Sequence, residues 1–260
     1  MVDEAGRVVG RALGSTGEFS LFGLRAIRDL FRPPYEFRET TRQVFDLGLR
    51  SAPLIAVSGV AVGIVLSMHT RASLERFGAE SMIPAGLALA LVRETGPLTA
   101  ALLLSGRIGA GIGAELGAMR VTEQIDALEA SAVDSFKYLV VTRTVACIIA
   151  LPILTTLMNF CGMLGGFIAE QASTGMSLRL YFDKSFSLID VTDYVPATVK
   201  TMVFGYIIAV TSSYLGFTTS QGTEGVGRAS TRAVVLSSIL IIVTNVVLVR
   251  IIFFLFPQLG

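Results

Sequence analysis

Long apolar runs alternate with short polar segments along the whole chain, and the runs are long enough to cross a membrane. A helix needs about 20 predominantly apolar residues to span the hydrocarbon core. No segment alternates apolar and polar residues with a period of two, as membrane strands would. The pattern therefore predicts an all-α membrane protein with five spans, at about 51–68, 83–106, 139–169, 195–217 and 233–256.

The residues before the first span form a region of their own, 1–45, ahead of a single five-span domain over 46–260. Between residues 19 and 31, apolar side chains and arginines recur at helix-like spacing, and Pro33-Pro34 follow. This pattern is typical of an amphipathic helix that lies in the membrane interface, and the two prolines would end it. A disordered tail is the alternative interpretation.

Lysine and arginine are distributed unevenly over the predicted loops. The side of the N-terminus would carry Arg7, Arg11, Arg25, Arg28, Arg32, Arg38, Arg42, Arg50, Arg107, Arg120, Lys137, Arg143, Arg228 and Arg232. The opposite side would carry only Arg71, Arg76, Arg179 and Lys184. Because basic residues concentrate on the cytoplasmic side of membrane proteins, the N-terminus is predicted to be cytoplasmic and the C-terminus to face outward.

Composition excludes several classes of function. The net charge of +1 gives no electrostatic basis for nucleic-acid binding. His69 is the only histidine, and no cysteine lies near it, so no metal site is expected. No G-x-x-x-x-G-K-[ST] motif occurs, so the chain is not expected to bind ATP through a P-loop of its own.

An acidic stretch, ELGAMRVTEQIDALE, occupies residues 115–129 in this otherwise apolar chain. Its apolar residues recur at spacings of three and four, which predicts a short amphipathic helix. The acids Glu123, Asp126 and Glu129 would form a neighbouring ridge, and Thr122 could cap the helix. Either a docking surface for a soluble partner or a solvated loop that anionic headgroups repel would fit this pattern.

Arg93 and Glu94 lie inside the second predicted span. A charged side chain near the bilayer centre costs about 2.5–3.5 kcal/mol on insertion scales, so such residues usually face a cavity or a partner helix. Thr95-Gly96-Pro97 follow and would weaken the helix there. The pair is interpreted as a polar spot in a substrate path or gate, and a structural clamp is the alternative.

Glycines four residues apart occur in three of the predicted spans or at their ends. The pairs are Gly59/Gly63, Gly109/Gly113 and Gly162/Gly166. Small residues at this spacing let helices approach closely in lipid, and we expect packing within the chain.

Three stretches closely resemble the sequence signature of MlaE/YrbE-type permeases. They are RETGPLTAALLLSGRIGAGIGAELGAMRVTEQIDALEASAVDSFKYLVVTR (93–143), GTEGVGRASTRAVV (222–235) and RPPYEFRETTRQ (32–43). Such permeases are membrane subunits of ABC transporters that work with MCE-domain proteins. The resemblance implies a homodimer in the bacterial inner membrane that moves phospholipids to or from a periplasmic MCE ring and maintains outer-membrane asymmetry.

The resemblance also implies how the work is divided among subunits. Two cytoplasmic P-loop ATPase subunits would bind ATP and Mg, so this chain would be a transport subunit and not an enzyme, with no cofactor of its own. A small cytoplasmic accessory subunit is a further candidate partner. The coupling helix that enters the ATPase would be 115–129, with the coupling residues Glu115, Arg120, Glu123, Gln124, Asp126 and Glu129.

Lipid would occupy an outward-open cavity between two copies, lined by spans one, two and five. Its expected contacts in this chain are Leu66, Leu74, Phe77, Arg93 and Glu94. The chain departs from the family pattern in having Thr142 and Ser135 where proline is usual. It also has Asn245 where an acid is usual, which removes a charge and argues against a polar role in the last span.

Two functions from other classes compete with this reading. A gradient-driven secondary transporter or channel would use Arg93 and Glu94 as a proton relay and would usually contain internal repeats. An integral-membrane enzyme of lipid metabolism would need clustered histidines or aspartates, which a lone His69 does not supply.

Overall fold

The computed structural model describes residues 2–33, 35–220 and 222–256, and these residues contain helices and no strand. Within them, five helical segments are long and apolar enough to cross a membrane: Phe37–Phe77, Glu80–Val121, Phe136–Thr174, Val191–Phe217 and Gly222–Leu255. The predicted all-α class is confirmed. Each segment contains the corresponding predicted span, apart from the last residue of the fifth, and most extend well beyond it.

The helices follow one another with short connections. Before the second span come α1 (Val2–Leu30), α2 (Phe37–Leu74), η1 (Glu75–Phe77) and η2 (Glu80–Met82). The second span is one continuous rod of five parts: α3 (Ile83–Ala90), η3 (Leu91–Thr95), α4 (Gly96–Leu104), η4 (Ser105–Gly109) and α5 (Ala110–Val121). The remainder is α6 (Gln124–Ala130), η5 (Lys137–Val141), α7 (Thr142–Thr174), α8 (Leu178–Phe186), α9 (Val191–Phe217) and α10 (Gly222–Leu255).

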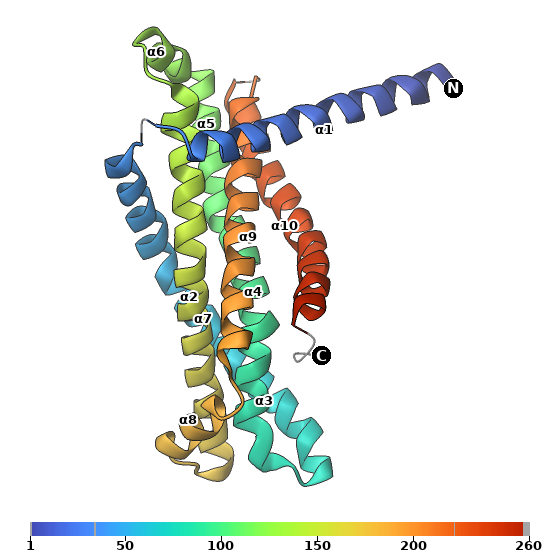
Figure 1. The fold of residues 1–260 in the computed structure, drawn as a ribbon, viewed down its shortest axis with the longest axis vertical. Coiled ribbons are helices and arrows are strands. Elements are labelled where there is room, and N and C mark those ends of the chain that lie inside the picture. Colours follow the sequence, from blue (N-terminus) through green and yellow to red (C-terminus); the bar gives the residue numbers. More distant parts are fainter. Residues whose placement is uncertain (1, 34, 221, 257–260) are drawn as a thin grey trace.

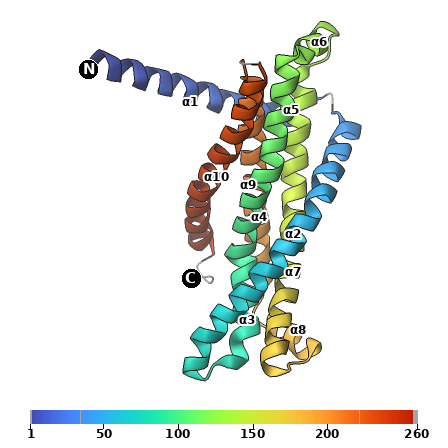
Figure 2. The same ribbon diagram turned by 180° about the vertical axis from the view of Figure 1, so that it is seen from behind.

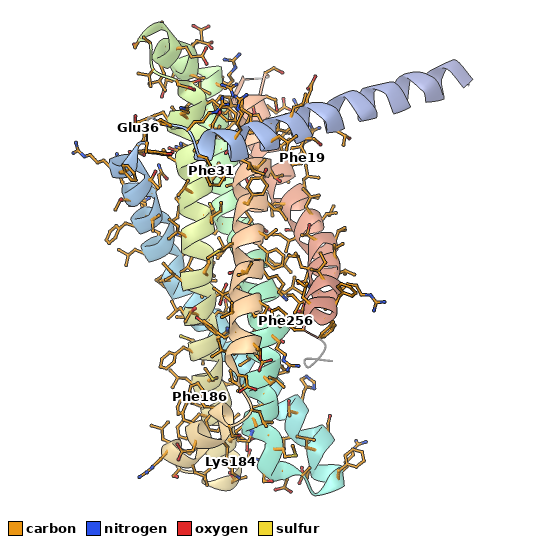
Figure 3. The ribbon with its side chains drawn as sticks, in the orientation of Figure 1. Phe19, Phe31, Glu36, Lys184, Phe186 and Phe256 are labelled. Atoms are coloured by element: carbon orange, nitrogen blue, oxygen red, sulfur yellow. The ribbon has the colours of Figure 1, made fainter. Side chains whose placement is uncertain are left out.

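The spans run lengthwise, and the two ends of the bundle differ. Helix α1 lies across one end, beside α6, whereas α8 and the start of α3 lie at the other end (Figure 1). We call these the α1 end and the α8 end. Side chains mark the same division, because Phe19 and Phe31 lie at the first and Lys184 and Phe186 at the second (Figure 3).

Glycines set the closest helix contact, between α2 and α7. A Cβ added to Gly63 would overlap the carbonyl group of Gly162, and one added to Gly165 would overlap that of Val60. At Gly59 the added atom would lie 2.8 Å from the carbonyl oxygen of Met158. The prediction that glycines pack helices within the chain is confirmed for Gly59 and Gly63, which let two backbones meet where a side chain would separate them; Gly165, which was not predicted, does the same.

The described part of α1 packs one face onto the bundle and leaves the other exposed. Phe22 makes edge-to-face contacts with Phe136, Tyr214 and Phe217, whereas Leu21 and Leu24 are 68% and 62% exposed. The predicted helix is therefore present in place of a disordered tail. Its exposed apolar side chains suit the membrane interface that the sequence predicts.

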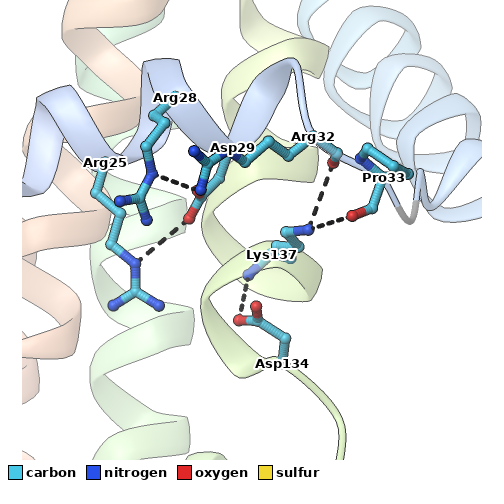
Figure 4. A network of polar contacts seen from close by, with 7 residues as sticks. All are labelled: Arg25, Arg28, Asp29, Arg32, Pro33, Asp134 and Lys137. Atoms are coloured by element: carbon cyan, nitrogen blue, oxygen red, sulfur yellow. Dashed lines mark hydrogen bonds and ion pairs between the residues drawn. The ribbon is translucent and has the colours of Figure 1, made fainter.

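A network of polar contacts holds the last turn of α1 to the start of the third span (Figure 4). The buried carboxylate of Asp29 accepts hydrogen bonds from Arg28 Nε at 3.0 Å and Arg25 Nε at 3.4 Å. Lys137 Nζ donates to the carbonyl oxygens of Pro33 at 2.7 Å and Arg32 at 3.4 Å. The segment after α1 is thus held to the start of the third span through the carbonyl groups of Arg32 and Pro33.

The predicted single helix over 115–129 is wrong. Helix α5 continues the second span to Val121, the chain turns at Thr122 and Glu123, and α6 begins at Gln124. Glu123 has φ 59°, in the left-handed region, which breaks the helix. The Thr122 hydroxyl donates to the carbonyl oxygen of Ala118, so Thr122 ends α5 and does not cap a new helix as predicted.

Candidate functional site

A cavity of about 580 Å³ opens in the membrane-spanning part of the bundle. Its walls come from the second span, from the start of α9 and from the second half of α10. The lining residues are Gly86, Leu89, Ala90, Arg93, Glu94, Asp193, Pro196, Ala197, Lys200, Asn245, Val246, Val249, Ile252 and Phe253. Arg93 and Glu94 both line this cavity, and their contact with lipid stays a prediction.

Both charged residues lie in a π-helical turn, η3, and both line the cavity. Consecutive residues of an α-helix point about 100° apart, and a π turn inserts an extra residue that widens the helix locally. The turn closes where the backbone N–H of Gly96 donates to the carbonyl oxygen of Leu91. Gly96 is required there, because a Cβ would overlap the side chain of Asn159 on α7.

Two ion pairs join the second span to α9 across the cavity. Lys200 Nζ lies 2.6 Å from Glu94 Oε2 and also donates to the carbonyl oxygen of Arg93 at 3.1 Å. Arg93 Nε lies 2.6 Å from Asp193 Oδ1. The α9 partners are almost fully buried, whereas the side chains of Arg93 and Glu94 are 33% and 42% exposed. One member of each pair is thus fixed by burial while the other faces the cavity.

Asp193 is held from a second direction by the backbone. Its Oδ2 accepts the N–H of Asp190 at 2.9 Å as part of the capping box that begins α9. A charge-assisted hydrogen bond at a helix start is favourable in itself. The carboxylate therefore keeps its position without Arg93, which makes it a rigid anchor for that guanidinium.

Asn245 corrects one expectation. Its amide Nδ2 donates to Glu94 Oε1, so residue 245 joins the polar cluster although it carries no charge. Its Oδ1 is buried without a hydrogen-bond partner among the residues described. The inference that asparagine argues against a polar role in the last span is wrong, because an amide can donate where a second carboxylate could not unless protonated.

The rest of the cavity wall is apolar. Leu89, Pro196, Val249 and Phe253 are among the residues that face it, beside the charged cluster. With two cations and two anions, the cluster has no net formal charge. An amphiphile would find hydrogen-bonding groups at one side of this cavity and a hydrocarbon surface at the other. Among the described residues, no group of His, Cys, Asp and Glu is arranged to hold a metal ion.

The other predicted cavity contacts do not lie in this cavity. Leu66 is half-buried and packs against the cluster of Leu87, Ala88, Leu91 and Met163. Leu74 ends α2, and Phe77 lies beyond it in η1 with 83% of its surface exposed. The three side chains are therefore near the α8 end, separated from Arg93 and Glu94, and their contact with lipid stays a prediction.

Several of the predicted coupling residues make contacts within the chain. Arg120 NH1 lies 2.5 Å from Asp126 Oδ1, and Glu129 Oε1 accepts the Ser135 hydroxyl at 2.5 Å. Glu115 lies further back on α5, 2.8 Å from the buried Arg143. Glu123 and Gln124 are exposed at the turn. The tip at the α1 end is thus a braced loop that presents Glu123 and Gln124 outward, while Glu115 belongs to the bundle.

Sequence reasoning missed Asp193 and Lys200. A signal for Lys200 was present, because a lysine inside an apolar span is as unusual as Arg93 or Glu94. Asp193 carries no such signal, since it lies just outside the predicted fourth span and resembles an ordinary helix-starting acid. Its distance of one hundred residues from Arg93 also hides the pairing.

A multi-pass helical bundle with an amphipathic internal cavity fits a membrane permease, and the comparisons with known proteins identify the family. The profile of the family described as Permease MlaE matches residues 40–251. The chain is 40% identical to a probable ABC transporter permease protein of Rickettsia bellii, with 94% of each chain covered. It is 31% identical to the intermembrane phospholipid transport system permease protein MlaE of Haemophilus influenzae, covering 94% of this chain and 92% of that one.

A plant relative extends the comparison. The chloroplastic protein TRIGALACTOSYLDIACYLGLYCEROL 1 of Arabidopsis thaliana is 34% identical over 82% of this chain and 61% of its own. The chain belongs to the MlaE permease family. It is a multi-pass membrane protein and the permease subunit of an ABC transporter.

Proposed function

We propose that this permease moves phospholipids between the bacterial inner membrane and a periplasmic path of MCE-domain proteins. The observation that carries the proposal is the cavity that joins a charged cluster to an apolar wall. Arg93 and Glu94 are partly exposed in it, and Val249 and Phe253 stand beside them. A phospholipid has the same division between a polar headgroup and acyl chains, and its transport gives the MlaE protein of Haemophilus influenzae its name.

The cluster suits a cargo that must also leave. Each charge already has a partner, so an empty cavity does not strand a bare ion in the membrane. A zwitterionic or anionic headgroup would exchange some of these contacts for its own, and the exchange would cost little in either direction. A cavity that bound its lipid too tightly would not release it, and transport would stop. The affinity of the cavity for the lipid must therefore allow both entry and exit.

The charge distribution supports a cytoplasmic α1 end. The α8 end carries Arg71, Arg76, Arg179 and Lys184, and Arg71 is already paired with the buried Glu170 at 2.5 Å. Most of the other lysines and arginines lie toward the α1 end. By the positive-inside rule, α1 and α6 face the cytoplasm, and the last turn of α10 lies toward the periplasm.

The turn at Glu123 and Gln124 is then the contact for a cytoplasmic P-loop ATPase. Helix α6, which begins at this turn, protrudes at the α1 end (Figure 1), and the Arg120–Asp126 pair stiffens the turn. A stiff tip transmits a push into α5, which is continuous with η3 and so with Arg93 and Glu94. That subunit would bind ATP and Mg, and α5 of this chain would transmit its movement to the cavity.

A second copy of the chain would complete the conduit. Helix α10 is the most apolar span and only 11% of its most apolar window is buried within the chain. Val243, Val246 and Val247 on it are more than half exposed. Pairing through α10 would bring two copies of the cavity toward one another, beneath an MCE ring at the α8 end.

The proposal is tested by lipid transfer from proteoliposomes that contain the whole transporter to an acceptor MCE protein. Glu94→Lys should abolish ATP-dependent transfer, because a cation beside Lys200 reverses the polarity of the cluster, while assembly with the ATPase persists. Arg179→Gln, which changes an exposed arginine of the α8 end, is the control. Transfer at the wild-type rate in Glu94→Lys would refute the proposed role of the cavity, and transfer driven by an ion gradient without ATP would favour a secondary transporter.

A further inference from the structure

A second cavity, of about 570 Å³, lies toward the α1 end and takes no part in the site described above. It lies between the first half of α2, η4 with α5, and the start of the third span. Both views show this half of α2 leaning away from α5 and α7 (Figures 1 and 2). Four arginines line it, and we call it the arginine cavity: Arg42, Arg50, Arg107 and Arg143.

The carboxylates of the arginine cavity leave part of this positive charge uncompensated. Glu39, Asp46 and Glu115 line it as well, three acids against four arginines. Asp46 lies 3.8 Å from Arg50 and 3.9 Å from Arg42, which are long, exposed pairs along one helix face. Such pairs contribute little, about 0–1 kcal/mol each. The ion pairs that Arg42 and Arg50 make along α2 are therefore weak.

Arg107 and Arg143 have unused capacity to donate. Arg107 Nε donates to the Ser51 hydroxyl at 3.2 Å, and no carboxylate of the described residues lies within ion-pair distance of it. Arg143 is 3% exposed and uses its two terminal nitrogens on Glu115 and on the carbonyl oxygen of Leu139. Its Nε is buried with no acceptor among the residues described. Both guanidinium groups could donate hydrogen bonds to a further anion.

The surroundings suit a phosphate that belongs to a lipid. The same half of α2 exposes Phe37, Phe45 and Leu49, which are 74%, 64% and 59% exposed. Leu47, Ile108 and Ile112 add apolar surface to the cavity wall itself. A free anion would gain nothing from these side chains, whereas a phospholipid would place its acyl chains along them and its phosphate among the arginines.

We propose that the arginine cavity binds the phosphate group of a phospholipid from the membrane leaflet at the α1 end. The site is separate from the cavity of Arg93 and Glu94, and only the choice of a lipid as the source of the phosphate rests on the proposed function. A lipid held here lies beside α2, whose second half is locked to α7 by Gly59 and Gly63. The permease thus has a separate site that recognises phospholipids of the leaflet at the α1 end.

The chain contains no tryptophan, so a single introduced one reports on one cavity at a time. Tyr138 lines the arginine cavity and Phe253 lines the other, which gives the reporters Tyr138→Trp and Phe253→Trp. The full-length protein is held in a maltoside detergent, which contains no phosphate. The probes are dibrominated phosphatidylglycerol, which quenches tryptophan fluorescence on contact, a diacylglycerol with the same brominated chains, and inorganic phosphate as a competitor.

Phosphatidylglycerol should quench the Tyr138→Trp reporter at concentrations about tenfold below those of diacylglycerol, the ratio expected for one charge-assisted contact. Arg50→Gln with Arg107→Gln should remove this preference and leave quenching of Phe253→Trp unchanged, which also shows that the variant is folded. Arg76→Gln with Arg179→Gln at the α8 end should alter neither reporter.

Equal quenching by the two lipids at Tyr138→Trp would overturn the proposal, and so would a preference that survives loss of both arginines. Removal of the preference by inorganic phosphate at matching concentration would support phosphate recognition but would identify the free anion as its source. If the brominated lipids quench Tyr138→Trp but not Phe253→Trp, the result would count against the proposed transport cavity. The proposal for the arginine cavity would not be affected.

Discussion

Lys200 Nζ and Glu94 Oε2 lie 2.6 Å apart across the cavity, with the lysine almost fully buried and the glutamate 42% exposed. This asymmetry assigns the two residues different tasks. Burial fixes the ammonium group, which also donates to the carbonyl oxygen of Arg93 in the π turn. The partly exposed Glu94 side chain has room to move, whereas the buried ammonium group does not.

Replacing Lys200 by methionine should impair both stability and transport. Glu94 would lose its cationic partner within the membrane-spanning bundle, at a cost of about 1–3 kcal/mol. The double variant Lys200→Met with Glu94→Gln should recover much of the stability but none of the transport, because the buried charge and its orphaned partner are both gone. Thermal unfolding in detergent and lipid transfer measure the two effects. Lys184→Met, at the α8 end, is the control; recovery of transport in the double variant would contradict the assignment.

A methyl group at Gly63 should disrupt the packing of α2 on α7. The added Cβ overlaps the carbonyl group of Gly162, and backbone cannot move aside as a flexible side chain would. Overpacking of this kind costs about 1–3 kcal/mol. Gly48→Ala on the same helix meets no atom within 4 Å and should be neutral or slightly stabilising. Unfolding midpoints of the two variants provide the comparison, and equal midpoints would mean that the contact does not hold the helices together.

Charge reversal at the protruding turn should weaken assembly with the ATPase. Glu123 and Gln124 are exposed there, so Glu123→Lys with Gln124→Lys should leave the fold intact. The exposed acid at Glu123 predicts a basic surface on the ATPase opposite it. Like charges placed across an interface cost several kcal/mol, so the ATPase should no longer co-purify. Asp183→Lys on α8, with its side chain 71% exposed, is the matched control at the opposite end. Undiminished co-purification would place the ATPase contact elsewhere.

The last turn of α1 should lose stability in acid. Burial raises the pKa of Asp29, but the hydrogen bonds and charges of Arg28 and Arg25 outweigh burial and set that pKa below the ordinary value of 3.8. The folded pKa is depressed, so its stabilisation is complete above 3.8 and is lost as pH falls through the lower, folded value. Both arginines are half-exposed, which limits the effect to about 1 kcal/mol.

Hydrogen exchange of α1, corrected for the intrinsic rate at each pH, measures this change. Protection in the wild type should fall by about fivefold, the equivalent of 1 kcal/mol, as pH falls below the ordinary pKa of aspartate. Asp29→Asn should show weaker protection already at neutral pH and no further step in acid. A step of the same size in Asp29→Asn would assign the acid sensitivity to another group.

The spans could be predicted because their signal is local. Each apolar run is long enough to identify itself, and Arg93 and Glu94 stand out inside one of them for the same reason. The glycines at 59, 63 and 162 also carry a local spacing signal. These features depend on residues within one or two helical turns of each other, which a sequence displays directly.

The partners of Arg93 and Glu94 could not be predicted in the same way. Asp193 and Asn245 meet them only because α9 and α10 pack beside the second span, and no local pattern encodes that contact. The break at Glu123 was missed for another reason. A glutamate in the left-handed region contradicts its own backbone preference, so the tertiary structure overrides the helical pattern of 115–129.

The π turn at Leu91–Thr95 also separates the second span into two parts with different angular settings. The part before it, α3, contacts α8, α2 and α7, whereas the part after it, α4, contacts mainly α7, α9 and α10. One extra residue changes the phase of the side chains between the two parts. Removing a single residue from the turn would rotate the first part against the second by about 100°, so side chains that now share one face of the rod would lie on different faces.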